Sequence, residues 1–529
     1  MKKWDKSGSY AALLGIVLGV VLTLTVGSIM RDIRGHKIRA NYSNWAKLNL
    51  ILEEVRKNYV DTVDVKSLTD AAVVAALAEL DPHSIYLPPV ELVESETELA
   101  GNFDGIGIQF NVPNDTAIVL EVIPGGPSEK VGLMQGDRLL KVDDTPIAGV
   151  KFPQDSMVRR MKGPSGTKVT VTVQRGREVI PFEIVRGKIP VHCVDASFMV
   201  NDTTGYIRLT KFTRTTFKEV SEASSRLLDA GMKMLLFDLR DNSGGYLDQA
   251  LLLADMFLHK GDEIVYLQGK NRKKEDYTAS GRGKLQEIPL SVLINENSAS
   301  SSEIFAGAIQ DNDRGVIIGR RSFGKGLVQE PINFTDGSGV RLTVARFHTP
   351  SGRCIQKPYK DYGRDLYNRY TTGEMFQQDS IKVDTTEVYH TVSGRTVYGG
   401  GGIIPDVFVP MDTTRVTAFY MGCNRKATQM RFASAVSDTY RASLRQIDNY
   451  GDLETFLDQL DIPRRFLDFA AREDGLRPAA GEWEKSAPYL EPQLRALIAR
   501  YSKLGDNAFY KMYLPVDEVV KVALATAAK

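Results

Sequence analysis

A predicted strand, a tight turn and a helix within residues 290–311 form the pattern that most constrains this chain. Leu290 to Ile294 are an apolar run, and small polar residues follow them. The apolar residues of 304–309 then recur at helical spacing. Ser300 and Glu303 match a capping box, which places Ser300 at the N-cap of the helix. A hydroxyl there faces the positive end of the helix dipole and unpaired backbone N–H groups.

A lysine in a glycine-flanked turn follows about 25 residues later. Lys325 stands between Gly324 and Gly326, and Gln329 comes four residues after it. One interpretation is an ordinary N-cap serine and a turn lysine; the other is a serine nucleophile with a lysine general base. A lysine acts as a base only when neutral, which requires burial that disfavours the ammonium. On a strand, Gln329 would face the same side as Lys325, and Phe323 is expected to help exclude water.

Four ordered segments favour the catalytic interpretation. They are DLRDNSGG (238–245), NSASSSEI (297–304), RSFGKGLVQ (321–329) and TPSGR (349–353). Together they resemble the carboxy-terminal processing proteases, or tail-specific proteases, over roughly residues 40–410. This is a serine peptidase family with a Ser-Lys site and an embedded PDZ domain. The resemblance implies a crotonase-like α/β core, with Ser300 as nucleophile, Lys325 as base and Gln329 orienting the amine.

The remaining site residues are expected to stabilise and support this chemistry. Two backbone N–H groups, of Gly244 and Ser301, would form the oxyanion hole. Ser322 and Glu303 match positions that the family uses as supporting polar contacts, although Glu303 also suits a capping box. Ser301 and Ser243 stand where many relatives have Ala and Pro. The other serines of this stretch leave the register of the nucleophile open; they are Ser298, Ser301 and Ser302.

Residues 101–187 have the alternating strands and Gly-Pro turns of a PDZ domain. Gly105, Ile106, Gly107 and Ile108 match the loop that binds a peptide's terminal carboxylate in such domains. The following strand would pair with the peptide by β-augmentation. The other interpretation is that this stretch only enters a strand and binds nothing. The PDZ interpretation predicts protein substrates with exposed apolar C-termini.

An uncharged stretch of about 20 residues, 11–30, is long enough to cross a bilayer as a helix. A cleaved signal peptide is the competing interpretation, but no A-x-A-like site precedes Arg31. Basic residues flank both ends, so the positive-inside rule does not fix the orientation. We therefore expect an uncleaved single-pass anchor in the cytoplasmic (inner) membrane. The resemblance implies that the protease faces the extracytoplasmic, periplasmic side.

Composition excludes several other classes of protein. The net charge of +1 gives no electrostatic case for nucleic acid. The cysteines are Cys193, Cys354 and Cys423, too far apart for metal-ligand spacing or a disulfide framework. H-E-x-x-H and G-x-S-x-G motifs are absent from the sequence, so we expect neither a zinc protease nor an α/β-hydrolase. No cofactor or metal is expected. A homo-oligomer or an adaptor protein is left open.

Apolar strands and helical stretches alternate after residue 188, which predicts an α/β core. Before the PDZ region, Ser67 to Asp70 are expected to cap a second helix, and His83 is expected to be structural. Residues 358–395, polar and aperiodic, are expected to be an exposed insertion. The predicted order is an N-terminal tail and anchor (1–40), a helical region (41–100), PDZ (101–187), protease core (188–411) and a helical extension (412–529).

Three alternatives remain beside the Ser-Lys protease. The run Asp241 to Gly245 resembles the G-D-S-G-G of trypsin-like enzymes, but Asn242 holds the Asp place and no histidine lies in a matching context. A catalytically inactive PDZ scaffold would only tether partners. A non-proteolytic enzyme on a crotonase-like core is the third. Ser300, Lys325 and Gln329 together argue against the scaffold.

Overall fold

The computed structural model describes residues 44–112, 115–123, 125–360 and 362–527, in two units, 1–79 and 80–529. The first unit contains α2 (Asn44–Asn58) and α3 (Val65–Ala78). The N-cap of α3 is Asp64, whose carboxylate accepts from the N–H groups of Lys66 and Ser67. The predicted cap at 67–70 is therefore wrong, because Asp64 supplies an acceptor three residues earlier.

The predicted membrane span at 11–30 lies outside the described residues. Among the helices that the structure does describe, none combines the length and the apolarity needed to cross a bilayer.

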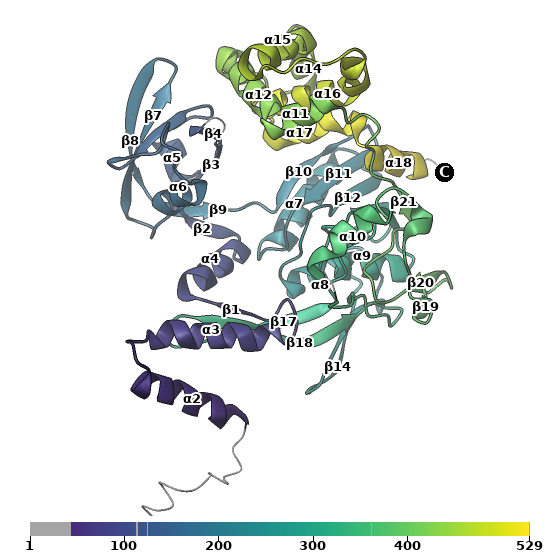
Figure 1. The fold of residues 1–529 in the computed structure, drawn as a ribbon. Helices are drawn as coiled ribbons and strands as arrows, with labels where there is room; N and C mark the ends of the chain where they lie inside the picture. Colours follow the sequence, from purple (N-terminus) through teal and green to yellow (C-terminus); the bar gives the residue numbers. More distant parts are fainter. Residues whose placement is uncertain (1–43, 113–114, 124, 361, 528–529) are drawn as a thin grey trace, which may run out of the picture. The chain divides into compact units, whose positions relative to one another are not determined.

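The central sheet of the second unit contains most of the apolar strands that the sequence predicted after residue 188, but the predicted strand at 264–267 lies in another sheet (Figure 1). Its strand order is β10-β11-β12-β15-β16-β21. Neighbouring strands run parallel except β10 with β11. Parallel neighbours need crossover connections. Single helices connect β11 with β12 and β15 with β16, and the other two crossovers also contain strands outside this sheet. The strands are β10 (Val194–Met199), β11 (Thr204–Leu209), β12 (Met234–Asp238), β15 (Leu290–Ile294), β16 (Val316–Gly319) and β21 (Val407–Phe408).

Helices from distant parts of the chain cover the two faces of this sheet. Phe237 and Val292 pack on one face with three helices that alternate with the strands. The adjacent residues Leu236 and Leu293 point to the other face and pack with Val520, far along the chain. Because both faces are buried, the strands appear as continuous apolar runs. The helices are α7 (Thr216–Asp229), α8 (Leu247–Asp255), α9 (Ser301–Asp311) and, on the second face, α18 (Glu518–Ala527).

A second sheet contains the hairpin that follows Lys325. Its order is β1-β18-β13-β14, and β17 also pairs with β18. Strands β17 and β18 form an antiparallel pair, with a β-bulge between Val328 and Gln329. The elements are β1 (Ile85–Leu87), α4 (Pro89–Leu99), β13 (Glu263–Gly269), β14 (Arg272–Thr278), β17 (Leu327–Asn333) and β18 (Gly339–His348).

Most side chains of the segment 358–395 are exposed, as the sequence predicted for this polar insertion. A few are buried against the core, and Arg369 and Met375 are each 3% exposed. Polar residues of the segment also bind the backbone and charged groups of the core, which holds the insertion in place. Its elements are η2 (Tyr362–Arg364), α10 (Asp365–Thr371), η3 (Gln378–Ser380), β19 (Val388–His390) and β20 (Thr396–Tyr398).

Residues 101–187 form a β-domain with its own core around Val119, Leu139 and Met157. The sheet order is β3-β4-β5-β7-β8, with β6 paired to β5, so β3 is an edge strand. Two outer strands, β2 and β9, pair at Gly105 and Gly187. The elements are β2 (Asn102–Gly105), β3 (Ile108–Asn111), β4 (Ala117–Val122), α5 (Pro127–Lys130), β5 (Arg138–Val142), β6 (Thr145–Pro146), α6 (Gln154–Met161), β7 (Lys168–Arg175), β8 (Glu178–Val185) and β9 (Gly187–Pro190).

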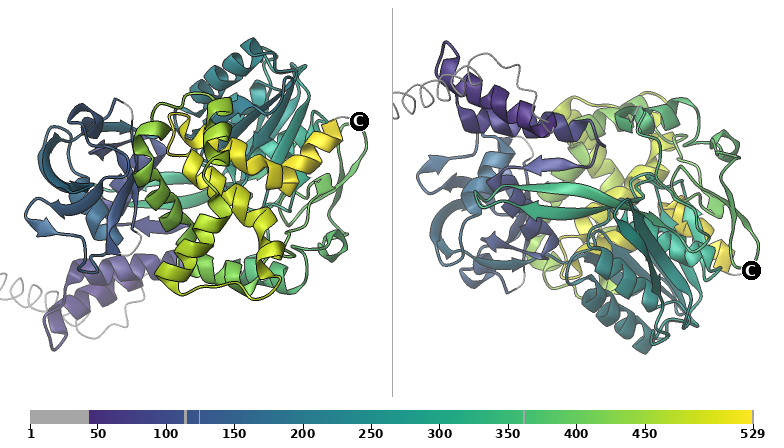
Figure 2. Two further views of the ribbon diagram at one scale, coloured as in Figure 1. Left: turned by 90° about the horizontal axis from the view of Figure 1, so that it is seen from above. Right: turned by 90° about the horizontal axis from the view of Figure 1, so that it is seen from below.

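The chain after residue 412 is helical, light green to yellow in Figure 2. Most of these helices enclose a separate core around Phe466, Leu490 and Leu494. A buried ion pair joins the segment to the central sheet, because Arg240 binds both Asp238 and Asp517. The helices before α18 are α11 (Ala418–Arg425), α12 (Thr428–Thr439), α13 (Arg441–Leu444), α14 (Tyr450–Asp458), α15 (Ile462–Asp474), α16 (Glu482–Ala499), α17 (Gly505–Tyr513) and η4 (Leu514–Val516).

Candidate active site

Ser300 lies in a strained turn between β15 and α9. Its backbone has φ 54° and ψ −112°, a conformation that L-residues rarely adopt. Such strain is concentrated at functional sites, where the surrounding structure holds it in place. The next residue, Ser301, begins α9, so Ser300 stands at the amino end of a fully buried helix. The predicted strand, turn and helix are confirmed.

The hydroxyls of the neighbouring serines are already used in hydrogen bonds to the main chain. Ser298 Oγ donates to the Leu239 carbonyl at 2.8 Å, and Ser302 Oγ donates to the Asn242 carbonyl at 2.9 Å. Ser301 Oγ donates to the Gly245 carbonyl at 3.0 Å. These bonds fix all three neighbours as structural supports for the turn. Ser300 is therefore the best-placed nucleophile in this stretch.

The carboxylate of Glu303 joins the Ser300 turn to the lysine loop. It accepts from the backbone N–H of Ser300 at 2.9 Å and from that of Lys325 at 2.8 Å. It also accepts from Gly324 N–H at 2.6 Å and from Ser322 Oγ at 2.5 Å. Glu303 is fully buried, and burial raises its pKa against the opposing effect of these hydrogen bonds. The capping acid is thus also the anchor between the two segments.

Lys325 donates from Nζ to Gln329 Oε1 at 3.0 Å. The predicted contact is present, but strand alternation is not its cause, because Lys325 precedes β17 and a bulge precedes Gln329. Gln329 Nε2 donates in turn to the carbonyl of His83, so main-chain oxygen orients the amide. No hydrogen bond links Lys325 Nζ directly to Ser300 Oγ within the part of the chain that the structure describes.

Burial lowers the pKa of Lys325, and the nearby Arg341 charge lowers it further. The carboxylates of Glu303 and Asp81 oppose this shift. The net direction favours a neutral amine, which is the form a general base requires. Burial and the Lys325 charge also lower the pKa of His83 to about 4, so its ring stays neutral near pH 7.

A turn at 81–84 holds the His83 carbonyl that orients Gln329. The Asp81 carboxylate accepts from the N–H groups of His83 and Ser84 at 2.7 Å and 2.8 Å. The His83 ring contacts the hydroxyl of Tyr362 at 2.5 Å. His83 thus acts on the site through its backbone. Sequence reasoning missed this, because only the fold brings residues 83 and 329 together.

The two predicted oxyanion donors lie close together. A Cβ on Gly244 would stand 2.8 Å from the Ser300 Cβ and 2.9 Å from the Ser301 nitrogen, so only glycine fits. The Gly244 N–H donates to Asn242 Oδ1 at 2.9 Å. Use of this N–H by an oxyanion therefore requires that the Asn242 amide be displaced.

Aromatic side chains from the 358–395 segment and the lysine loop pack against one another and around Lys357. The Lys357 ammonium lies 3.7 Å from the ring centroid of Phe323 and 4.3 Å from that of Tyr362. Phe323 and Tyr362 stack edge to face at 5.8 Å. Exclusion of water by Phe323 remains a prediction; the ring packs against Tyr362.

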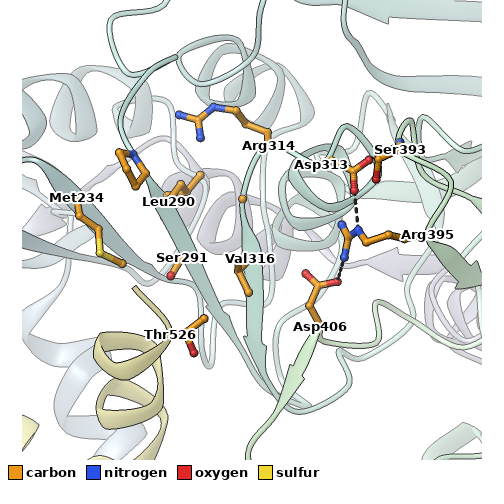
Figure 3. A pocket seen from close by; sticks show the side chains of 12 residues that line it. Met234, Leu290, Ser291, Asp313, Arg314, Val316, Ser393, Arg395, Asp406 and Thr526 are labelled. Carbon is orange, nitrogen blue, oxygen red and sulfur yellow. Dashed lines mark hydrogen bonds and ion pairs between the residues drawn. The ribbon is translucent and has the colours of Figure 1, made fainter. Parts of the chain in front are cut away.

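A separate cavity of about 520 Å³ lies at the opposite end of the central sheet. Met234, Leu290 and Val316 line it, and these are the first residues of β12, β15 and β16. Figure 3 shows Arg395 between Asp313 and Asp406, paired with both. In α/β sheets, ligands bind at the carboxyl ends of the strands, where Ser300 is found. Among the described residues, no cluster of three His, Cys, Asp or Glu side chains is arranged to hold a metal.

The predicted peptide-binding loop begins the edge strand of the β-domain. Gly107 has φ 79°, which favours glycine, and Ile108 is the first residue of β3. The Gly105 backbone pairs with Gly187, and the Ile106 side chain is buried in the domain core. The open side of β3 is available to an additional strand.

Comparisons with known proteins match both the protease region and the PDZ region of this chain. The model of peptidase family S41 matches residues 203–363, and the PDZ domain model matches residues 105–185. A carboxy-terminal-processing protease of Bartonella bacilliformis is 37% identical over 64% of this chain and 79% of its own length. The carboxy-terminal processing protease CtpA of Bacillus subtilis is 32% identical over 66% and 74%. The solved photosystem II D1 C-terminal processing protease is 26% identical over 70% and 87%, at a TM-score of only 0.38.

Proposed function

Because this chain belongs to the carboxy-terminal processing proteases of peptidase family S41, and is a serine-type peptidase, we propose that it is a membrane-anchored endopeptidase. In this proposal it binds protein C-termini through its PDZ domain and cleaves with Ser300 and Lys325. The bonds of one buried carboxylate carry the assignment: Glu303 holds both the Ser300 turn and the Lys325 backbone.

The proposed reaction needs a neutral Lys325. Ser300 Oγ attacks the carbonyl carbon of the scissile peptide bond, and its proton passes to the Lys325 amine. The resulting ammonium then gives a proton to the leaving amine, which departs as the new N-terminus. Water hydrolyses the acyl-enzyme by the same proton route in reverse. The lowered pKa of Lys325 and its bond to Gln329 Oε1 support this role.

Two backbone N–H groups are proposed to bind the oxyanion. Ser301 N–H lies at the first turn of α9, where the helix dipole favours negative charge. Gly244 N–H lies close to it but is held by Asn242 Oδ1. We therefore expect substrate binding to shift Asn242 and to bring Lys325 into hydrogen-bond reach of Ser300. The supporting roles of Ser322 and Glu303 rest on their mutual bond. The α/β core is proposed to be crotonase-like.

The PDZ domain is proposed to bind substrate chain ends that are exposed and apolar. Gly105, Ile106, Gly107 and Ile108 would bring backbone N–H groups to the terminal carboxylate, and edge strand β3 would pair with the peptide. The partly buried side chains of β3, Ile108 and Phe110, offer apolar surface for a side chain of the peptide.

Residues 11–30 are proposed to anchor the chain in the cytoplasmic membrane, with the protease on the periplasmic side. The support is the uncharged length of this stretch, which matches the thickness of a bilayer.

Digestion of an unfolded protein by the full-length chain in detergent tests the site. We expect Ser300→Ala and Lys325→Ala each to abolish detectable cleavage, because one removes the nucleophile and the other the base. Ser243→Ala is the matched control: Ser243 is exposed and belongs to the trypsin-like alternative. Undiminished cleavage by either of the first two variants would exclude the proposed pair.

Substrate capture by the inactive Ser300→Ala chain tests the PDZ role. Amidation of the substrate's C-terminus should weaken capture, since the carboxylate charge is lost. Equal capture of the free acid and the amide would remove the proposed carboxylate-binding loop.

A further inference from the structure

The loop that carries Lys325 belongs to no helix or strand. Residues 321–326 have irregular backbone between β16 and β17. Backbone polar groups that are buried need partners. Some partners of this loop are main-chain groups, among them the carbonyls of Ile403 and Ser298. The others include two oppositely charged side chains, Arg369 and Glu303.

The carbonyls of the loop point to a single arginine. Arg369 Nη1 donates to the carbonyl of Ser322 at 2.8 Å and to that of Arg321 at 3.2 Å. Arg369 Nη2 donates to the carbonyl of Phe323 at 3.2 Å. A guanidinium has five donors in a rigid plane, so one side chain can hold three successive peptide groups.

The N–H groups of Ser322 and Phe323 bind main-chain carbonyls, and the next two N–H groups of the loop bind Glu303. Gly324 and Lys325 donate to its two carboxylate oxygens at 2.6 Å and 2.8 Å. The backbone entering Lys325 is therefore bound from one side by a cation and from the other by an anion. Rotation of a peptide plane in this stretch would break a charge-assisted hydrogen bond.

Arg369 is itself fixed by the segment that was expected to be exposed. It lies on α10, only 3% exposed, with its Nε 3.0 Å from Asp365 Oδ2. Glu374 Oε1 lies 3.8 Å from Arg369 Nε. The Glu374 carboxylate also forms a bidentate pair with the Arg321 guanidinium, at 2.7 Å and 2.6 Å. Because Arg369 holds the Arg321 carbonyl, the contacts form a closed ring between α10 and the loop.

We propose that Arg369 is a positioning residue for peptide hydrolysis: it sets the direction of the backbone at 321–323 and thereby places the Lys325 amine relative to Ser300. This inference rests on the proposed function of the Ser300–Lys325 pair. It makes the 358–395 segment a part of the catalytic apparatus. Arg369 contacts neither the substrate nor the reacting atoms in this role.

Arg369→Ala and Arg369→Lys in the full-length chain test the proposal, with Arg364→Ala as the control. Arg364 lies exposed beside the same helix. We expect kcat to fall about 10- to 100-fold in both Arg369 variants, because small misplacements of a catalytic group cost that much. The lysine variant keeps the charge but lacks the planar fork. KM and the capture of C-terminal peptides should stay unchanged.

Guanidinium ion, at concentrations that leave the wild-type thermal unfolding curve unchanged, should restore part of kcat in Arg369→Ala and none in Lys325→Ala. A kcat of Arg369→Ala within about twofold of wild type would overturn the proposal. The proposal would also be overturned by a loss of kcat that guanidinium does not restore and that is proportional to the fall in melting temperature across the variants. A wild-type chain without cleavage would instead contradict the proposed function, and this inference would fall with it.

Discussion

At the scale of one residue, Glu303 both caps helix α9 and connects it to the loop that carries Lys325. In a capping box, the acid at the third helical position usually binds only the N–H group of the N-cap residue. Here the same carboxylate also binds Ser322, Gly324 and Lys325, about twenty residues further on. Its negative charge favours the Lys325 ammonium, whereas burial and Arg341 favour the neutral amine. The protonation of the base is therefore set by a balance of opposed neighbours.

The pH dependence of activity should report the titration of Lys325. The base works only when neutral, and its pKa lies below its ordinary value of 10.5. We expect kcat/KM to rise with pH through one ionisation below 10.5 and then to level off. His83, whose pKa is lowered to about 4, should add no step near neutrality.

Rates measured from pH 5 to pH 10 on a short peptide substrate check this expectation. His83→Gln is the matched variant, because the His83 carbonyl belongs to the backbone and remains. A step near pH 6.5 that disappears in His83→Gln would assign the base to the histidine instead.

Residues close together in sequence were predictable, and residues brought together only by the fold were not. The spacing of Lys325 and Gln329 indicated their contact, although a loop and a bulge, not alternation, produce it. Nothing in the sequence connects Arg369 with residues 321–323. The roles of the Ser300 and Lys325 side chains remain predictions until the variants are measured.

At the scale of elements, α18 completes the layer on the second face of the central sheet. Val520 and Ala523 are fully buried against Leu236 and Leu293. The strands themselves were predictable from their apolar runs. Their covering helix was not, because an apolar face does not reveal which distant helix packs on it.

Substitution of Val520 tests this packing. Val520→Asp places an unpaired carboxylate in the core, and we expect it to lower the free energy of unfolding by about 3–5 kcal/mol. Ala525→Asp, at an exposed position of the same helix, should change it by no more than about 0.5 kcal/mol. Denaturant unfolding followed by circular dichroism measures both. Equal, small effects would show that α18 does not cover the sheet.

Across the whole molecule, carboxylates from three regions meet beside Arg500. Glu121 comes from β4 of the PDZ region, Asp195 from β10 and Asp506 from α17. Arg500 pairs with Asp506 at 2.5 Å. Burial and then the Asp506 charge raise the pKa of Asp195 to about 6, while Arg208 and Arg500 oppose the shift. Burial and then Asp506 also raise the pKa of Glu121.

The contribution of Asp195 to the free energy of unfolding should therefore fall as pH rises from about 4 to about 6. In that window the folded chain keeps a proton on Asp195 that the unfolded chain, with an ordinary pKa of 3.8, has lost. A shift of this size corresponds to at most about 3 kcal/mol. Asp195→Asn should raise the free energy of unfolding at pH 8 and leave it nearly unchanged at pH 4.

Urea unfolding at the two pH values provides the measurement, and Asp202→Asn, at an exposed position of the β10–β11 turn, provides the control. A gain for Asp195→Asn that is the same at both pH values would rule out titration as its cause.

The position of α18 has a consequence for biosynthesis. Strand β16 ends at Gly319, but the helix that shields the sheet begins only at Glu518. While the ribosome synthesises the intervening chain, the apolar face of the central sheet that α18 later covers is exposed. Domains generally fold as units, so we expect the protease core to reach its final packing only after the residues of α18 have been synthesised.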